Sequence, residues 1–89
     1  MFYTYILRCK DKLDKRVFYV GSSSDLKKRV RSHLSKNSQF TKNFDKVELV
    51  YYEACLNKTD AIRRELQLKT GFGRGYLKRR LGNYLKNNK

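Results

Sequence analysis

The alternation of apolar and polar residues predicts three strands. Residues 2–9 (FYTYILRC) are rich in aromatic and β-branched side chains, which favour strands. The polar segment 10–16 predicts a hairpin loop, and residues 17–21 (VFYVG) predict a second strand antiparallel to the first. The polar segment 36–45 predicts a loop before a third strand at 46–54 (KVELVYYEA).

A first helix is predicted over about residues 25–35. Leu26, Val30 and Leu34 recur at four-residue intervals and form its apolar stripe. Short polar side chains stand directly before the helix, where they favour the N-cap. The two candidate caps are Ser24 and Asp25.

Two more helices are predicted in the C-terminal half. One spans about residues 58–69, with Asn57 or Thr59 as its N-cap. The glycine-rich segment TGFGRG at 70–75 interrupts the chain, and a basic helix follows over about 76–86.

The resulting order, β-β-α-β-α-α, is typical of an α+β domain with a small three-stranded antiparallel sheet flanked by helices. A chain of 89 residues is expected to form one domain, 1–89, with a basic C-terminal helix and tail at about 76–89. Two cysteines, Cys9 and Cys55, are too few for a disulfide scaffold and lack zinc-site spacing. We expect both to be small apolar residues of strands.

Charge narrows the choice of partner. The chain has 22 lysines and arginines against 8 acidic residues, a net charge of +14, and no acidic residue follows Glu65. Such a field attracts polyanions, and nucleic acid is favoured over an anionic membrane because the C-terminal segment lacks a broad apolar face. No segment predicts a membrane span or a signal peptide, so a soluble cytoplasmic protein is expected.

One carboxylate lies in an unexpected place. A helical wheel puts Glu65 inside the apolar arc of the second helix, beside Ala61 and Leu68. Burial of a carboxylate is costly without a cation, and Lys69 lies four residues further on in the same arc. An ordinary surface ion pair and a functional role both stay open for Glu65.

The first helix and the hairpin contain a similar group of polar residues. Arg29 and His33 lie side by side at the border of the apolar stripe. Tyr5 and Tyr19 are expected to lie near one another once the first two strands pair. Each of these residues taken alone is also compatible with a basic surface or with core packing.

Taken in order, these segments resemble the GIY-YIG nuclease domain, and most closely its small stand-alone bacterial branch. That branch reads Y-x-Y-I-L, Y-x-G, D-L-x-x-R, E-L-V-Y, R-x-E-x-x-L-K and G-x-G-R. This chain reads YTYIL, YVG, DLKKR, ELVYY, RRELQLK and GFGRG, over most of residues 3–78. Two positions depart from the family: Ser22 replaces a basic residue found in part of it, and the late asparagine has only Asn83 as a remote candidate.

The resemblance implies a divalent-metal-dependent endonuclease that hydrolyses DNA phosphodiester bonds. Larger family members have separate DNA-recognition domains, for which 89 residues leave no room, so low sequence specificity is expected. Repair, recombination and mobile-element roles all stay open. It implies Mg²⁺ or Mn²⁺ held by Glu65, because Mg²⁺ needs few protein oxygens. It implies Arg29 at the phosphate and one tyrosine as general base, with Tyr19 preferred over Tyr5. An adjacent cation is expected to lower the pKa of that phenol. The implied catalytic residues are Tyr5, Tyr19, Arg29, His33 and Glu65.

The remaining basic residues are expected to contact phosphates, which position a nucleic acid without specifying its sequence. Branched DNA, damaged DNA and RNA all stay open as partners, and a monomer is favoured. Two alternatives are a non-catalytic DNA- or RNA-binding module on the same fold and a ribosome-associated basic protein. The residues expected at phosphates are Lys27, Lys28, Arg31, Arg74, Lys78, Arg79 and Arg80.

Overall fold

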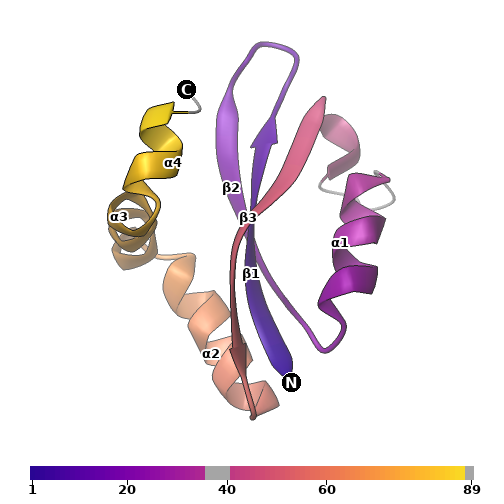
Figure 1. Cartoon of the computed structure of the whole chain (residues 1–89), viewed down its shortest axis with the longest axis vertical. Helices are drawn as coiled ribbons and strands as arrows, with labels where there is room; N and C mark the ends of the chain where they lie inside the picture. The colour runs from indigo at the N-terminus through magenta and orange to yellow at the C-terminus, as the bar shows by residue number, and fades with distance from the viewer. Residues whose placement is uncertain (36–40, 88–89) are drawn as a thin grey trace.

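A computed structural model of the chain describes residues 1–35 and 41–87. Its strands form one antiparallel sheet in the order β2-β1-β3, which leaves β2 at one edge (Figure 1). The predicted α+β class and three-stranded antiparallel sheet are confirmed. Of the predicted loop 36–45, residues 36–40 lie outside the described residues, and 41–43 form a short 3₁₀ turn. The strands are β1 (Phe2–Lys10), β2 (Arg16–Ser23) and β3 (Lys46–Cys55).

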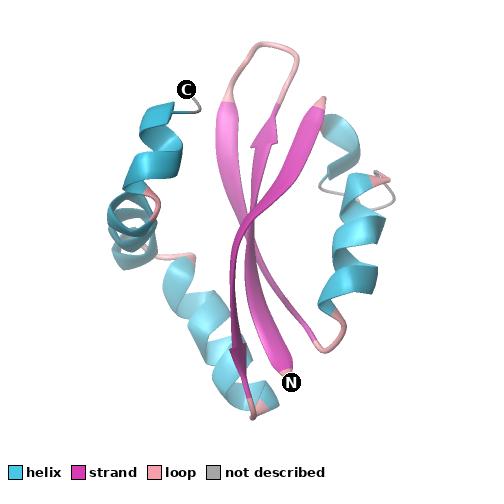
Figure 2. Cartoon of the chain, in the orientation of Figure 1, coloured by secondary structure: helices cyan, strands magenta, loops and turns pink. Residues whose placement is uncertain are grey.

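Helices cover both faces of the sheet. Figure 1 shows α1 on one side and α2, α3 and α4 in a row on the other, and Figure 2 shows the same layers coloured by secondary structure. No helix among the described residues is long and apolar enough to cross a membrane. The helices are α1 (Leu26–Leu34), α2 (Lys58–Leu68), α3 (Gly71–Arg80) and α4 (Gly82–Asn87).

The first two helices begin with side-chain caps. Asp25 caps α1 by accepting a hydrogen bond from the backbone N–H of Lys28. Asn57 caps α2 by accepting from the N–H groups of Thr59 and Asp60. The candidates Asp25 and Asn57 are therefore the caps, because each side-chain oxygen reaches N–H groups that the first helical turn leaves unpaired.

The predicted C-terminal helix over 76–86 was wrong in both its start and its continuity. Helix α3 already begins at Gly71 and ends at Arg80. Leu81 separates it from α4, which begins at Gly82. The glycine-rich segment is helical because Gly73 lies against α2: a Cβ at Gly73 would lie 2.0 Å from the carbonyl oxygen of Leu68. This glycine allows close packing of two helices and does not end one.

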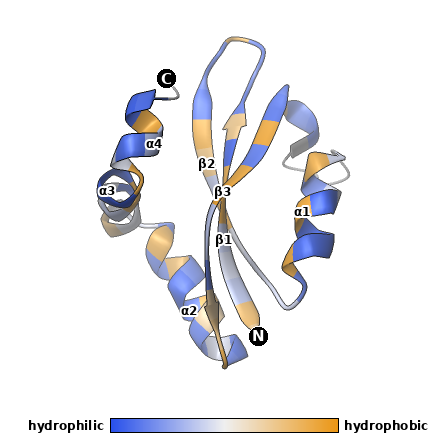
Figure 3. Cartoon of the chain, in the orientation of Figure 1, coloured by the Kyte–Doolittle hydropathy of each residue, from blue (hydrophilic) through white to orange (hydrophobic). Residues whose placement is uncertain are grey.

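The sheet has an apolar core on each face. On one face Ile6 of β1 packs with Val20, Leu68 and Leu77, beneath α2 and α3. On the other face Tyr5, Leu7 and Cys9 are fully buried, on the side of the sheet that α1 covers. Along the helices, hydrophobic residues recur among mainly hydrophilic ones (Figure 3), as expected for helices that cover a sheet. Burial confirms the apolar role expected of Cys9, whereas Cys55 ends β3 and is only partly buried.

The apolar stripe predicted for the first helix is displaced in the structure. Leu34, which the pattern placed in the core, is 51% exposed, whereas His33 is fully buried. The helix is therefore rotated toward its histidine, and a polar ring occupies a core position.

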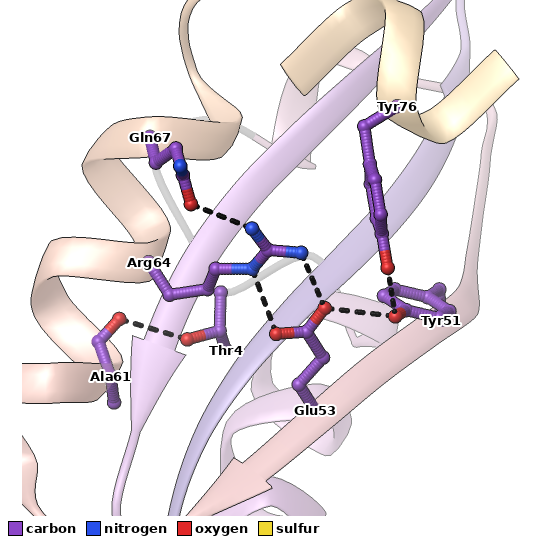
Figure 4. A network of polar contacts seen from close by, with 7 residues as sticks. All are labelled: Thr4, Tyr51, Glu53, Ala61, Arg64, Gln67 and Tyr76. Atoms are coloured by element: carbon purple, nitrogen blue, oxygen red, sulfur yellow. Dashed lines mark hydrogen bonds and ion pairs between the residues drawn. The ribbon is translucent and has the colours of Figure 1, made fainter. Parts of the chain in front are cut away.

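A polar network joins α2 to β3 and α3 (Figure 4). The Arg64 guanidinium donates from two nitrogens to the Glu53 carboxylate, at 2.9 and 3.0 Å. Tyr51 donates to the same carboxylate at 2.8 Å and lies 2.9 Å from the Tyr76 hydroxyl. Thr4 of β1 adds a 2.8 Å bond from its hydroxyl to the Ala61 carbonyl of α2. These contacts fix the helix that carries Glu65.

Candidate active site

Tyr5 lies at the centre of the candidate site. It belongs to the middle strand, is fully buried, and pairs across the ladder with Gly21 of β2. A Cβ at Gly21 would lie 2.5 Å from the Tyr5 hydroxyl, closer than non-bonded atoms approach. The glycine of YVG is therefore required because the tyrosine ring passes directly against its backbone.

Helix α1 brings two nitrogen groups to the Tyr5 hydroxyl. Arg29 and His33 are one helical turn apart, so they lie on the same face. The Arg29 Nε donates to the Tyr5 oxygen at 3.2 Å, and the His33 Nε2 lies 3.0 Å from it. Arg29 can only donate, so the Tyr5 oxygen accepts from it, while the tautomer of His33 decides which of Nε2 and the Tyr5 hydroxyl donates in the other bond.

Tyr19 completes this cluster from the edge strand. Its ring centroid lies 5.1 Å from that of His33 and 6.2 Å from that of Tyr5. Unlike Tyr5, it is only partly buried. The structure thus brings Tyr5, Tyr19, Arg29 and His33 together, four of the five residues predicted to be catalytic.

Burial controls the protonation of two members of the cluster. Desolvation raises the pKa of Tyr5, and the hydrogen bond from Arg29 lowers it by less than burial raises it. Desolvation also lowers the pKa of His33, and the nearby charge of Arg29 lowers it further. The expected lowering by arginine is thus outweighed at Tyr5, because this phenol is buried. A buried neutral phenol suits a positioning role better than that of a base in contact with water.

Glu65 belongs to α2, which lies on the side of the sheet opposite α1. Its carboxylate accepts a 2.6 Å hydrogen bond from the Ser22 hydroxyl and a 2.7 Å ion-pair contact from the Lys69 ammonium. Its side chain is 18% exposed. Partial burial alone would raise the pKa of Glu65, but the hydrogen bonds from Lys69 and Ser22 outweigh burial and hold it below its usual value. The carboxylate is therefore ionised at neutral pH.

The two halves of the site meet at consecutive residues of the edge strand. Gly21 lies against Tyr5, and the next residue, Ser22, reaches Glu65. Successive strand residues point to opposite faces, so the tyrosine cluster and the carboxylate flank β2 from its two sides. Among the described residues, the hydrogen bonds of Glu65 go to Ser22 and Lys69 and not to the tyrosine cluster.

Comparison with known proteins identifies the family of the chain. The GIY-YIG catalytic domain family matches residues 1–80. The chain belongs to the GIY-YIG family. The resemblance read from the sequence motifs is thereby confirmed, and the family is one of nucleases.

Relatives of this GIY-YIG protein are small bacterial proteins. UPF0213 proteins of Staphylococcus haemolyticus and Staphylococcus saprophyticus are each 36% identical over 69 residues, which cover 76% of this chain and 79% of the relative. One from Clostridium perfringens is 37% identical over 70 residues, 78% of this chain and 71% of the relative. These names state no activity, and no solved structure matches the chain.

GIY-YIG nucleases typically use a divalent metal ion, and the donor set here fits a hard ion that needs few protein ligands. No group of three or more His, Cys, Asp or Glu side chains gathers within the described residues. Glu65 offers an ionised carboxylate, and one of its oxygens already contacts a cation, the Lys69 ammonium. A single carboxylate suits Mg²⁺, which retains waters and binds phosphate oxygens. For a metal ion to bind this carboxylate oxygen, the Lys69 ammonium would have to move away from Glu65.

The predicted phosphate-binding residues form two groups on opposite sides of the sheet (Figure 1). All seven side chains are exposed. Arg80 also lies 6.0 Å above the Tyr51 ring, so part of its role is packing. The α1 group is Lys27, Lys28 and Arg31, and the α3 group is Arg74, Lys78, Arg79 and Arg80.

Sequence reasoning missed the role of Ser22. The predicted second strand ended at Gly21, and the serines after it were interpreted as connector and cap, whereas β2 continues to Ser23. Strand alternation extended by two residues would have put Ser22 on the face opposite Gly21, toward α2. Its contact with Glu65 depends on the tertiary fold.

Proposed function

We propose that this chain is a divalent-metal-dependent endonuclease that hydrolyses DNA phosphodiester bonds with low sequence specificity. One observation supports the proposal above all: Gly21 and Ser22 lie between an ionised carboxylate and a cluster in which the exposed Arg29 meets the buried Tyr5 and His33. Phosphodiester hydrolysis needs a cation at the phosphate, a positioned water and a proton acceptor. These groups, from separate parts of the sequence, provide that chemistry at one end of one strand.

Arg29 and Glu65 are proposed to act on the phosphate. When bound, Mg²⁺ or Mn²⁺ would supply positive charge at the scissile phosphate, with Glu65 as its protein ligand. A guanidinium has five N–H donors, so the bond to Tyr5 fixes Arg29 and leaves further donors for phosphate oxygens. Arg29 would then stabilise the charge that grows in the transition state.

We assign the general base to Tyr19 and a positioning role to Tyr5. Tyr19 is partly exposed at the edge of the sheet, whereas Tyr5 is fully buried with its hydroxyl against Gly21. His33 contacts both tyrosines, by a hydrogen bond to Tyr5 and by ring packing on Tyr19. Tyr19 would take the proton from the attacking water.

The second candidate is a non-catalytic nucleic-acid-binding module on the same fold. The Lys69–Glu65 contact favours it, because an ion pair of this kind neutralises the carboxylate without any metal. In either case we propose DNA as the partner, a monomer as the working form, the cytoplasm as location, and repair or recombination as the setting.

A cleavage assay tests the nuclease proposal. The purified protein is incubated with supercoiled and branched DNA in Mg²⁺, Mn²⁺ or EDTA. We expect nicking only with metal, and a loss of about 100-fold or more in Glu65→Gln. Asp60→Asn, which removes another acid from the same helix, is the matched control and should retain activity. Equal nicking by Glu65→Gln would point to a contaminant, and DNA binding without nicking would favour the binding module.

A second pair of variants tests the phosphate role. Arg29→Lys keeps the positive charge but loses the planar donor geometry. We expect it to lower kcat about 10- to 100-fold with little change in DNA affinity, because the lost interaction belongs to the transition state. Arg31→Lys, on an exposed position of the same helix, is the control. An equal effect of both changes would remove Arg29 from the site.

A further inference from the structure

A cavity of about 620 Å³ runs along the edge strand on the side opposite α1. It is bounded by β2, the end of α2, α3 and α4 (elements labelled in Figure 1). Its volume is in the range of pockets that bind small organic ligands. Much of its surface is apolar, supplied by Phe18, Val20, Leu77 and Leu85.

The rim of this cavity is basic. Arg74 and Lys78 line it from one face of α3, a turn apart. Both are exposed, and neither side chain has a hydrogen-bond or ion-pair partner among residues 1–35 and 41–87. Arg16 lines the cavity from β2, with its guanidinium 3.7 Å from the Asp14 carboxylate. An apolar floor beneath the unpaired cations of Arg74 and Lys78 fits a ligand that combines a flat apolar body with negative charge.

The cavity borders the Glu65 half of the candidate active site. Lys69, whose ammonium contacts Glu65, contributes to its lining. Tyr19 also contributes from β2, although its ring packs on His33 on the other side of that strand. A ligand in the cavity would therefore lie next to the ion pair that a metal must displace.

We infer that this cavity binds an unpaired nucleotide of the DNA substrate. The base would lie on the apolar floor, and the flanking phosphates would lie on the rim formed by Arg74 and Lys78. The inference rests on the proposed nuclease function and names its substrate class: DNA with an unpaired nucleotide beside the cleaved bond. A paired base is stacked inside the duplex and does not reach the floor, whereas an unpaired base offers a π-face to Phe18. A second copy of this chain is disfavoured as occupant, because it also carries +14.

The experiment compares two DNA duplexes with the same paired sequence, one fully paired and one with a single additional unpaired 2-aminopurine. Binding is measured by fluorescence anisotropy in EDTA, so that affinity is read without cleavage. We expect the bulged DNA to bind about tenfold more tightly, and the 2-aminopurine emission to change on binding. In Leu85→Trp the added ring fills the cavity, so this preference should disappear while affinity for paired DNA stays. Leu85→Gln, which makes the floor polar without filling it, should weaken the preference.

Charge variants provide matched controls. Arg74→Ala/Lys78→Ala should reduce binding of the bulged DNA more than of the paired DNA. Lys27→Ala/Lys28→Ala removes the same charge from α1 and should reduce both equally. Equal affinity of the native protein for both DNAs, or a preference that survives Leu85→Trp, would overturn the inference. So would equal or tighter binding of a bulged RNA of the same sequence. None of these results depends on metal or on Glu65, so the cleavage assay judges the nuclease proposal separately.

Discussion

His33 shows how a single residue connects the stability of this fold to its candidate site. The ring is fully buried, its Nε2 is bonded to the Tyr5 hydroxyl, and its Nδ1 has no hydrogen-bond partner among the described residues. An unpaired buried polar atom has a cost that a core residue such as Phe would avoid. Because the ring also holds both tyrosines, we regard this cost as part of the site's construction.

Acid is predicted to destabilise the fold through this histidine. The folded pKa of His33 is lowered, by burial first and by Arg29 second. The unfolded chain then binds more protons than the folded one, so the free energy of unfolding falls as the pH drops below about 6.5, by at most about 1.4 kcal/mol per pH unit. The measurement is urea unfolding at pH 7.5, 6.5 and 5.5.

Between pH 7.5 and 5.5, the predicted change in stability comes from one side chain. His33 is the only histidine of the chain, and the lowered pKa values of Glu53 and Glu65 act at more acidic pH. His33→Phe should therefore give nearly constant stability from pH 7.5 to 5.5. If the native protein is equally stable at pH 7.5 and 5.5, the His33 ring is protonated as easily in the folded chain as in the unfolded one.

Much of the tyrosine cluster could be predicted from the sequence, and the surroundings of Glu65 only in part. Helical periodicity puts Arg29 and His33 on one edge of α1, and strand pairing brings Tyr5 near Tyr19. The Lys69 partner of Glu65 follows from four-residue spacing. The Ser22 contact does not, because hydrogen-bond pairing with β1 decides where the edge strand ends.

At the level of elements, the docking of α2 determines where Glu65 lies. Arg64 is bonded through two nitrogens to Glu53 of β3, and its guanidinium lies 4.7 Å above the Tyr76 ring of α3. Arg64→Ala would leave the half-buried Glu53 carboxylate without its cation and would remove the guanidinium from the Tyr76 ring. We expect a loss of about 1–2 kcal/mol in the free energy of unfolding, reduced from fully buried pairs because both side chains are partly exposed.

The neighbouring arginine supplies the control for this prediction. Arg63 is exposed on the same helix, so Arg63→Ala should change stability by no more than about 0.5 kcal/mol. Urea unfolding of both variants, with Glu53→Ala and the double variant, gives the coupling energy. If Arg64→Ala costs no more than Arg63→Ala, the network does not dock the helix.

Elements with regular periodicity were predictable, and those set by contact between helices were not. The strands and α1 follow from apolar spacing to within a few residues. The start of α3 does not, because glycine in a sequence indicates a turn, whereas Gly73 lies in a helix at a position where a Cβ would overlap the Leu68 carbonyl of α2. Similarly, burial of His33 in place of Leu34 reflects packing against two tyrosines that lie far away in the sequence.

At the scale of the whole molecule, the edge strand lies between two basic layers. Helix α1 presents Lys27 and Lys28 on one side of the sheet, and α3 presents Lys78 and Arg79 on the other. The candidate site lies at β2, between these layers. A DNA phosphate bound at that site would therefore be flanked by cations from both helices, which explains why a charge of +14 is not confined to one face.

This arrangement predicts how salt weakens DNA binding. Each phosphate that a lysine or arginine neutralises steepens the fall of log K with log salt by about 0.9, so Lys27→Ala/Lys28→Ala should flatten the slope by about 2. Lys78→Ala/Arg79→Ala should flatten it by a similar amount, and the two effects should add because the pairs lie on different layers. Lys42→Ala/Lys46→Ala, near the distant strand β3, should leave it unchanged. A slope that responds to only one of the first two pairs would place the DNA on one helical layer and away from the β2 edge where the candidate catalytic groups meet.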